Sequence, residues 1–303
     1  MDAKELKYSP TASPVWRLVS KKHHIIVPFN TDRKGLPIYF VHSVGGEVTT
    51  YYQLARHLDA DHKFCGIQAP IRKFNEIPGM SIELLARHYV KAVQNYQPEG
   101  PLVLGGWSVG AVIALEMAHQ LQSRGREVRG LVVLDGNLTN AVGGLRPWDL
   151  RYYYELARNV PNWITQDLVE EFRRGGLRRR VQRKLYSAIG RHLWLGNDAS
   201  RPHALDGFID TSGWPSAQVS FARKLYDAGE AYVPKPYRGR VLVYAATTGP
   251  LTRLNQVEAS WTSVACCIET LRLDGTHLSI IQEPRVIDLA NHLRDQLRRV
   301  EGV

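Results

Sequence analysis

The residues Gly106-Trp107-Ser108-Val109-Gly110 have types and a spacing that could support nucleophilic chemistry. They form a G-x-S-x-G sequence between an apolar run, residues 101–105, and a helical pattern, residues 111–124. In a strand–turn–helix context this sequence places a serine on a sharp, strained bend with its hydroxyl exposed. Glycines flank the serine because a Cβ there would clash where strand and helix pack closely. Ser108 is therefore the first candidate for a nucleophile.

A serine hydroxyl is a weak nucleophile unless a base removes its proton and a third group orients that base. In this class of fold the chain order is serine, acid, histidine, so the base follows Ser108. His277 is the preferred base because it lies on a polar turn between the last predicted strand and the last predicted helix. His292, within the final helix, and His192 and His203, within a long insertion, are the alternatives.

The acid is predicted from the ends of the strands. Many α/β-hydrolases carry it after the strand that follows the insertion, but residues 245–251 contain no carboxylate here. Asp135 ends the strand predicted at 128–134, next to the strand of the serine, and active sites of open parallel sheets assemble at that edge. We therefore predict Asp135 as the acid. Asp274 is the alternative, although three residues before His277 it is better placed to shape the turn.

A developing oxyanion needs backbone donors. One is predicted to be the N–H of Val109, the residue after the nucleophile. The other is assigned to Val44, in the turn His42-Ser43-Val44-Gly45-Gly46 that follows an early predicted strand. His42 lies at a strand end before the nucleophile, so we interpret it as a structural rather than a catalytic histidine.

Predicted strands and helices alternate along most of the chain. The strands are predicted at residues 37–41, 63–67, 101–105, 128–134, 241–244 and 268–273, and the helices at 50–58, from Ser81 onward, at 111–124 and from near Pro284. This alternation indicates a mostly parallel sheet covered by helices on both faces. Residues 138–235 interrupt it with helical patches and no clear strand. A stretch of that length is unlike a bare loop, so we predict a helical lid.

The bulk composition is that of an ordinary globular protein. The chain has 303 residues, of which 44% are hydrophobic and 22% charged, so it could form one large or two small domains. No apolar run approaches the ~20 residues of a membrane span.

Residues 1–20 resemble a tail or linker without the apolar core of a signal peptide, so we expect a cytoplasmic protein. Cys65, Cys266 and Cys267 have no disulfide or metal-ligand spacing and are expected on buried strands.

The formal net charge of +10 is compatible with an acidic partner, a nucleic acid or an anionic membrane. Basic residues gather in one part of the insertion: Arg173, Arg174, Arg178, Arg179, Arg180, Arg183 and Lys184. This basic cluster is either a solvated helix face or a docking surface. It lacks interleaved aromatic residues, and no recognised nucleic-acid motif is present, so we expect no nucleic acid as a partner. We also expect no membrane as a partner.

Four segments together resemble one known family. They are residues 40–46, residues 66–70 (Gly-Ile-Gln-Ala-Pro), residues 99–118 around the serine, and the pair Leu134-Asp135 and Gly275-Thr276-His277. In these segments the chain resembles the thioesterase domains that release products from nonribosomal peptide and polyketide synthases. The resemblance covers most of residues 36–300 and is weakest across the lid. The chain departs from the family at Ser43, where proline is usual, and at Ala111, where glycine is usual.

The resemblance implies an α/β-hydrolase fold for residues 21–303, with the lid at about 138–235. It implies Ser108 as nucleophile, Asp135 as acid and His277 as base, with the Val44 and Val109 N–H groups at the oxyanion. The acyl group would arrive as a thioester on the phosphopantetheine arm of a carrier protein, so no further cofactor is expected. An acyl-serine ester would form and then be released by hydrolysis or cyclisation. Because carrier proteins are generally acidic, the basic cluster would be their docking surface.

Two other functions remain compatible with these residues. A carboxylesterase or lipase would use the same triad on an oxygen ester, but the basic lid and the Gly-Ile-Gln-Ala-Pro segment favour the thioesterase. A catalytically silent α/β-hydrolase-fold binding protein usually lacks the serine or the histidine, and this chain has candidates for all three triad positions.

Overall fold

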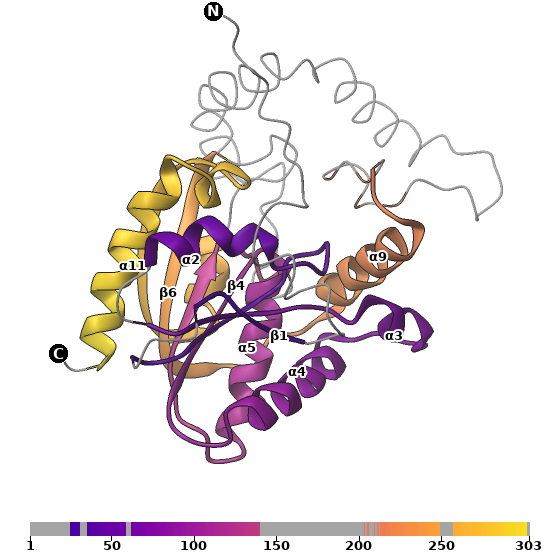
Figure 1. Ribbon diagram of the computed structural model, residues 1–303, viewed down its shortest axis with the longest axis horizontal. Helices are drawn as coiled ribbons and strands as arrows, with labels where there is room; N and C mark the ends of the chain where they lie inside the picture. The colour runs from indigo at the N-terminus through magenta and orange to yellow at the C-terminus, as the bar shows by residue number, and fades with distance from the viewer. Residues whose placement is uncertain are drawn as a thin grey trace, which may run out of the picture.

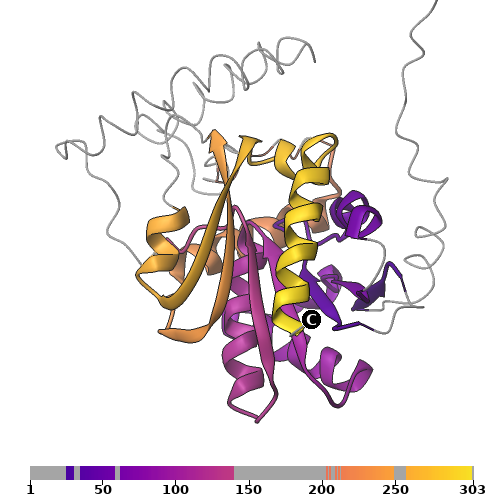
Figure 2. The same ribbon diagram turned by 90° about the vertical axis from the view of Figure 1, so that its left-hand side faces the viewer.

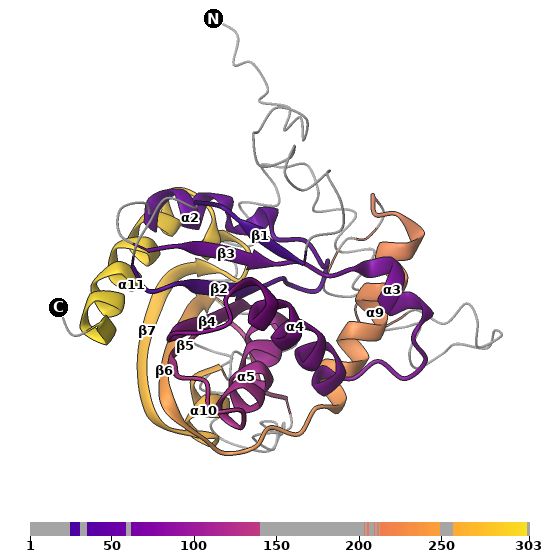
Figure 3. The same ribbon diagram turned by 60° about the horizontal axis from the view of Figure 1, so that its bottom comes forward.

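A mixed sheet forms the centre of the part of the chain that the structure describes. The computed structural model describes residues 25–30, 35–58, 62–139, 213–248 and 257–301, together with residues 203, 205, 209 and 211. The described strands are β1 (Ile26–Pro28), β2 (Ile38–Val41), β3 (Phe64–Ile67), β4 (Leu102–Trp107), β5 (Val128–Leu134), β6 (Tyr237–Thr248) and β7 (Ala265–Thr276). They lie in the order β1-β3-β2-β4-β5-β6-β7, and every neighbouring pair is parallel except β1 with β3 (Figure 3).

Helices cover both faces of this sheet, as Figures 1 and 3 show. The described helices are α2 (Tyr52–Leu58), α3 (Ile71–Glu76), α4 (Ile82–Tyr96), α5 (Val109–Gln122), α9 (Ser216–Ala231), α10 (Val257–Thr262) and α11 (Arg285–Glu301), with short 3-10 turns η1 (Thr49–Tyr51) and η5 (Ser279–Ile281). Tyr39 and Val41 of β2 pack in one core with α4 and α5, whereas Ile38 and Phe40 pack in a second core with α2 and α11. This alternation confirms a three-layer α/β architecture with a mostly parallel sheet, consistent with the α/β-hydrolase fold.

The strand order brings the ends of distant segments to one edge of the sheet. β4 lies between β2 and β5, with Val41 opposite Gly106 and Trp107 opposite Leu134. Because these strands are parallel, the turns that follow them all leave from the same edge. The strands β6 and β7 lie on the other side of β5 and end together, with Thr248 opposite Thr276. The residues after β2, β4, β5 and β7 are therefore neighbours in space.

The structure confirms several predicted elements and the residues predicted to begin or end them. β5 has the predicted bounds. Ser81 caps α4, since its Oγ accepts the Leu84 N–H at 3.2 Å. Gly125, just beyond α5, has φ +76°, the left-handed conformation that favours glycine after a helix. The apolar face predicted for the last helix is buried in α11, where Leu293 has no exposed surface.

The edge of the sheet differs from the sequence-based expectation. β6 and β7 are each 12 residues long and run side by side beyond the end of β5, as Figure 2 shows. The apolar pattern marked only residues 241–244 and 268–273, because residues near the start of β6 are partly exposed and β7, the edge strand, has exposed side chains along its length. Burial was correctly predicted for Cys65 on β3 but wrongly for Cys266 and Cys267, which are exposed on β7.

Part of the predicted lid is described. α9, near the C-terminal end of 138–235, is helical as expected and packs against α3, α4 and α5. The basic cluster at 173–184, His192 and residues 1–20 lie outside the described residues. Within the described ranges, no helix is both long and apolar enough to cross a membrane.

Truncation of Leu293 tests the packing of α11 on the sheet. Leu293→Ala is expected to lower the free energy of unfolding by about 2–5 kcal/mol, because it removes buried methyl groups and leaves a cavity. Chemical denaturation would measure this loss. The exposed Arg299→Ala on the same helix is the control and should change stability by no more than about 0.5 kcal/mol. Equal stability of both variants would contradict the buried position of Leu293.

Candidate active site

Ser108 lies on the bend between β4 and α5. Its backbone angles are φ 59° and ψ −129°, in a region that residues other than glycine rarely occupy. Such a conformation costs about 1–3 kcal/mol and persists only where the surrounding structure enforces it. The strained strand–turn–helix bend predicted from the G-x-S-x-G sequence is therefore present.

Close backbone contacts enforce this bend. A Cβ on Gly106 would lie 2.2 Å from the carbonyl carbon of Gly110, and a Cβ on Gly110 would lie 2.5 Å from the carbonyl oxygen of Val41. A Cβ on Gly136 would lie 2.5 Å from the carbonyl oxygen of Ser108. The glycines thus let the serine turn pack directly against the ends of β2 and β5.

Three hydrogen bonds, two of them through the hydroxyl of Tyr51, fix the serine turn to the neighbouring strands. The Ser108 N–H donates to the carbonyl of Leu134 at 2.9 Å. The buried hydroxyl of Tyr51 accepts the Trp107 N–H at 2.9 Å and donates to the carbonyl of Val41 at 2.6 Å. Sequence reasoning assigned no role to Tyr51, because nothing in its local sequence shows that its hydroxyl bridges two strands.

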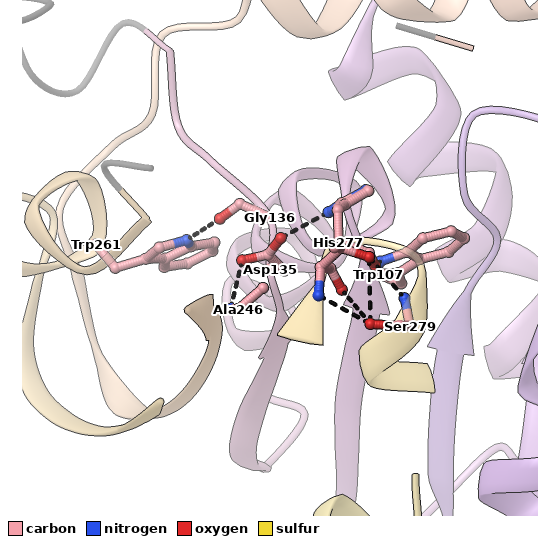
Figure 4. Close-up of polar contacts among 8 residues, drawn as sticks. Trp107, Asp135, Gly136, Ala246, Trp261, His277 and Ser279 are labelled. Atoms are coloured by element: carbon pink, nitrogen blue, oxygen red, sulfur yellow. Dashed lines mark hydrogen bonds and ion pairs between the residues drawn. The ribbon is translucent and has the colours of Figure 1, made fainter. Parts of the chain in front are cut away.

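Asp135 and His277 contact each other at the same edge of the sheet. The Nδ1 atom of His277 lies 2.7 Å from Oδ2 of Asp135 (Figure 4). The second carboxylate oxygen, Oδ1, accepts the N–H of Ala246 at 2.9 Å. The Asp135 side chain is only 8% exposed and that of His277 is 35% exposed. A buried carboxylate whose two oxygens are both bonded can hold the imidazole in one orientation.

The turn that carries Asp135 is itself fixed. Asp135 has φ 47°, and its N–H donates to the carbonyl of Tyr244 at 2.8 Å. The next carbonyl, of Gly136, accepts the indole N–H of the buried Trp261 at 2.7 Å (Figure 4). β6 and α10 therefore position the carboxylate, although neither lies near it in the sequence.

Trp107 joins the serine segment to the histidine. Its indole ring stacks on the ring of His277, with the centroids 4.8 Å apart and the planes 28° apart. Its indole N–H also donates to the carbonyl of His277 at 3.1 Å, as drawn in Figure 4. The neighbouring turn is fixed by Ser279, whose Oγ accepts the Thr276 N–H at 2.8 Å. The residue directly before Ser108 thus holds the imidazole in place, a role that sequence reasoning missed.

The alternative acid, Asp274, and two alternative bases, His292 and His203, have other hydrogen-bond partners. Asp274 accepts a hydrogen bond from the Thr247 hydroxyl at 3.3 Å, in keeping with a role in shaping the turn. His292 bonds the Tyr244 hydroxyl at 3.0 Å, and His203 bonds Asp227 of α9 at 3.0 Å. Both therefore have structural partners away from the Asp135–His277 pair.

The predicted oxyanion donors lie on two adjacent segments. Val109 is the first residue of α5, where N–H groups have no partner within the helix. Val44 lies in the turn after β2, which is closed by a 3.0 Å hydrogen bond from the Gly46 N–H to the Ser43 carbonyl. Both side chains pack in one apolar cluster with Ala222 of α9. The assignment of these two N–H groups to an oxyanion stays a prediction.

His42 is buried beside this turn. It has no exposed surface, its Nδ1 lies 2.6 Å from the Ser43 carbonyl, and its Nε2 lies 2.6 Å from the Tyr89 hydroxyl. Burial lowers the pKa of His42 from 6.5 to about 4. These contacts agree with the structural interpretation of His42. Among the described residues, no group of three or more His, Cys, Asp or Glu side chains is placed to hold a metal ion.

The lowered pKa of His42 predicts how stability depends on pH. As the pH falls from 6.5 to 4, the unfolded chain binds a proton at this histidine and the folded chain resists it, so the folded state loses stability. With a folded pKa of about 4, the loss between pH 7 and pH 4 is about 3 kcal/mol. His42→Gln does not titrate, so its free energy of unfolding should fall by about 3 kcal/mol less than that of the wild type over this range. Denaturant titrations at several pH values measure how the free energy of unfolding of each protein depends on pH. Equal dependence in the wild type and in His42→Gln would contradict the prediction.

Comparison with known proteins places the chain in a family. The model of the thioesterase domain family matches residues 36–297. Polyketide synthase PksR of Bacillus subtilis (strain 168) is 36% identical over 110 residues, which are 36% of this chain and 4% of the synthase. Chondramide synthase cmdD of Chondromyces crocatus is 26% identical over 288 residues, which are 90% of this chain and 7% of that synthase. The chain thus spans only a small part of the length of these relatives.

Solved structures share the fold. The NocB thioesterase domain from the nocardicin cluster matches with a TM-score of 0.57 at 24% identity, over 92% of this chain and 99% of that domain. Its covalent complex with a fluorophosphonate nocardicin G analog matches with a TM-score of 0.59 at the same identity, over 90% of this chain and 99% of that one. These likenesses support the α/β-hydrolase fold. With the family model matching most of its length, the chain belongs to the thioesterase domain family and is an enzyme of the thioesterase class.

Proposed function

We propose that this enzyme releases an acyl, polyketide or peptidyl chain from the phosphopantetheine thioester of a carrier protein, through an acyl-serine intermediate at Ser108. One observation carries the proposal. The 2.7 Å contact between His277 and Asp135 lies at the sheet edge where the strained Ser108 turn also leaves. A base that is oriented by a buried carboxylate beside a serine on such a bend is the arrangement that nucleophilic acyl transfer requires.

In the acylation step, Ser108 is the nucleophile. His277 takes the hydroxyl proton while Oγ forms a bond to the thioester carbonyl carbon. The carbonyl oxygen becomes an oxyanion that accepts hydrogen bonds from the Val44 and Val109 N–H groups. When the C–S bond breaks, the leaving sulfur takes the proton from His277. Asp135 accepts the Nδ1–H, so Nε2 is the nitrogen that moves the proton, and the carboxylate stabilises the imidazolium that forms.

The second step releases the acyl group. His277 removes a proton from water, and the resulting nucleophile attacks the acyl-serine carbonyl. The C–Oγ bond then breaks and Oγ takes the proton back from His277, which gives a carboxylic acid and free Ser108. A hydroxyl or amine within the bound acyl chain would replace water and give a cyclic product. These steps use only side chains, backbone N–H groups and water, so no cofactor is part of the proposal.

The carrier-protein partner is inferred from the relatives. They are multidomain polyketide and nonribosomal peptide synthases of which this chain covers 4–7%. A domain of such an assembly would receive its substrate from a neighbouring carrier domain. The cytoplasmic location expected from the sequence belongs to the same proposal, and cell fractionation would test it.

Mass spectrometry of the intact protein tests the acyl-serine intermediate. After incubation with a panel of acyl-carrier thioesters, the wild type should gain the mass of an acyl group, because Ser108 forms the ester before release. Ser108→Ala should gain no mass and should lose at least about 1000-fold of turnover, since the nucleophile is absent. The mass of the adduct also identifies the preferred acyl group.

Matched substrates provide the control for this experiment. The enzyme should hydrolyse a long acyl thioester faster than the oxygen ester of the same acid. Preference for the oxygen ester would identify a carboxylesterase instead. An acyl adduct on Ser108→Ala would overturn the assignment of the nucleophile.

Charge reversal tests docking at the basic cluster, which we propose as the carrier-binding surface. Arg179→Glu with Arg180→Glu is expected to raise KM for a carrier-bound thioester about tenfold or more, because it removes electrostatic attraction to an acidic carrier. KM for a small thioester without a carrier should not change. Arg238→Glu with Arg299→Glu makes the same change in net charge at exposed positions elsewhere and is the control. An equal rise of KM in both double variants would show that net charge, rather than this cluster, attracts the carrier.

A further inference from the structure

We propose that His42, held by Tyr89, is a positioning residue that aims the Val44 N–H at the developing oxyanion. The contact that carries this inference is the one between the His42 ring and the carbonyl of Ser43. It rests on the proposed function, which assigns the Val44 N–H to the oxyanion. His42 touches no reacting atom in this proposal and acts through the backbone.

The geometry of the peptide bond makes this contact specific. The carbonyl of Ser43 and the N–H of Val44 belong to one planar peptide unit, in which they point in opposite directions when the peptide is trans. The Ser43 carbonyl is held by His42 Nδ1 at 2.6 Å and by the Gly46 N–H at 3.0 Å. Two donors at the carbonyl end of a rigid plane fix the direction of the N–H at its other end.

The hydrogen bonds define the tautomer of His42. A carbonyl oxygen only accepts hydrogen bonds, so Nδ1 carries the proton that bonds Ser43. In a neutral ring Nε2 then has a free lone pair, which accepts the hydroxyl proton of Tyr89 at 2.6 Å. Burial favours the neutral imidazole by lowering the pKa of His42, and it keeps Tyr89 protonated by raising the pKa of that hydroxyl. The donor chain therefore runs in one direction, from Tyr89 to His42 to Ser43.

Four elements keep the His42 ring and its backbone in place. The His42 N–H pairs with the carbonyl of Ile67 on β3 at 2.9 Å. The ring meets Tyr89 of α4 edge to face at 5.5 Å and Phe221 of α9 at 5.8 Å. On the other side, a Cβ on Gly110 would lie 2.6 Å from the His42 carbonyl oxygen, so the turn after β2 packs directly against the start of α5. These contacts fix the oxyanion peptide relative to the serine turn.

The donor chain also strengthens the predicted oxyanion donor. A hydrogen bond accepted by a carbonyl polarises its peptide unit, and successive hydrogen bonds in a chain reinforce one another at low dielectric. Tyr89 and His42 have no exposed surface, so water does not weaken the effect. The Val44 N–H is thereby a better donor than an unassisted amide would be.

Two substitutions of His42 separate the Nδ1 contact from mere packing. His42→Asn places its amide nitrogen near the position of Nδ1 and keeps a donor for the Ser43 carbonyl. His42→Gln places its amide group near the position of Nε2 and keeps a partner for Tyr89, but it has no donor for Ser43. We expect His42→Gln to lower kcat by about 10- to 100-fold with little change in KM, a part of the ~100- to 1000-fold loss that follows removal of an oxyanion donor. His42→Asn should stay within about threefold of wild-type kcat.

Tyr89→Phe provides a second variant that preserves ring packing. It removes only the hydroxyl that fixes the tautomer of His42, so we expect kcat to fall about three- to tenfold, again with little change in KM. All variants are measured as the full chain on one acyl thioester, with denaturant unfolding of each. A purely structural role for His42 would instead lower stability and leave the kcat of the folded protein unchanged.

The outcomes distinguish this inference from the proposed function. Wild-type kcat in both His42→Gln and Tyr89→Phe would overturn the positioning role, as would equal losses in His42→Gln and His42→Asn. If Ser108→Ala retained wild-type turnover, the proposed function would fail and this inference with it. An inactive Ser108→Ala together with a fully active, folded His42→Gln would remove the positioning role alone.

Discussion

The close approach of backbones at the start of α5 is the constraint on which the site depends. β4 and α5 meet so tightly that neither Gly106 nor Gly110 has space for a Cβ, and Ser108 between them is held at a positive φ. The free energy of this strain is modest in comparison with the stability that the buried parallel sheet supplies. Because the turn packs on Val41 and bonds Leu134, its position is defined by the strands on both sides.

The other groups of the site are positioned relative to this turn. Asp135 follows β5, the neighbour of β4, and its carboxylate is held by Ala246 of β6. His277 follows β7 and is fixed both by Asp135 and by the indole of Trp107. Since parallel strands all end at one edge, four segments that are far apart in sequence reach the same small volume. Each additional hydrogen bond limits how far the imidazole can turn, which is what the proposed proton transfer requires.

Helix α9 and the residues just before it are directly connected to the turn after β2. The side-chain amide of Gln218 on α9 donates to the Gly45 carbonyl at 2.9 Å, and Trp214 lies 3.2 Å from where a Gly45 Cβ would be. Phe221 of the same helix packs on His42. Two elements thus hold the turn that carries the predicted oxyanion donor: β3, within the sheet, and the helix α9. A substrate that displaced α9 would therefore also act on this turn.

The sequence by itself determined what depends on near neighbours in the chain. The serine turn, the Ser81 cap and the buried face of α11 follow from glycine sterics, capping and helical periodicity, which act within a few residues. The parallel sheet predicted from the alternation of strands and helices was also enough to place Asp135 and His277 at one edge. Only the tertiary structure decided which groups hold them. Tyr51, Trp107 and Ala246 act through contacts with segments distant in sequence, and the exposure of Cys266 and Cys267 depends on β7 being an edge strand. Such contacts arise from packing between layers, for which no local pattern in the chain carries a signal.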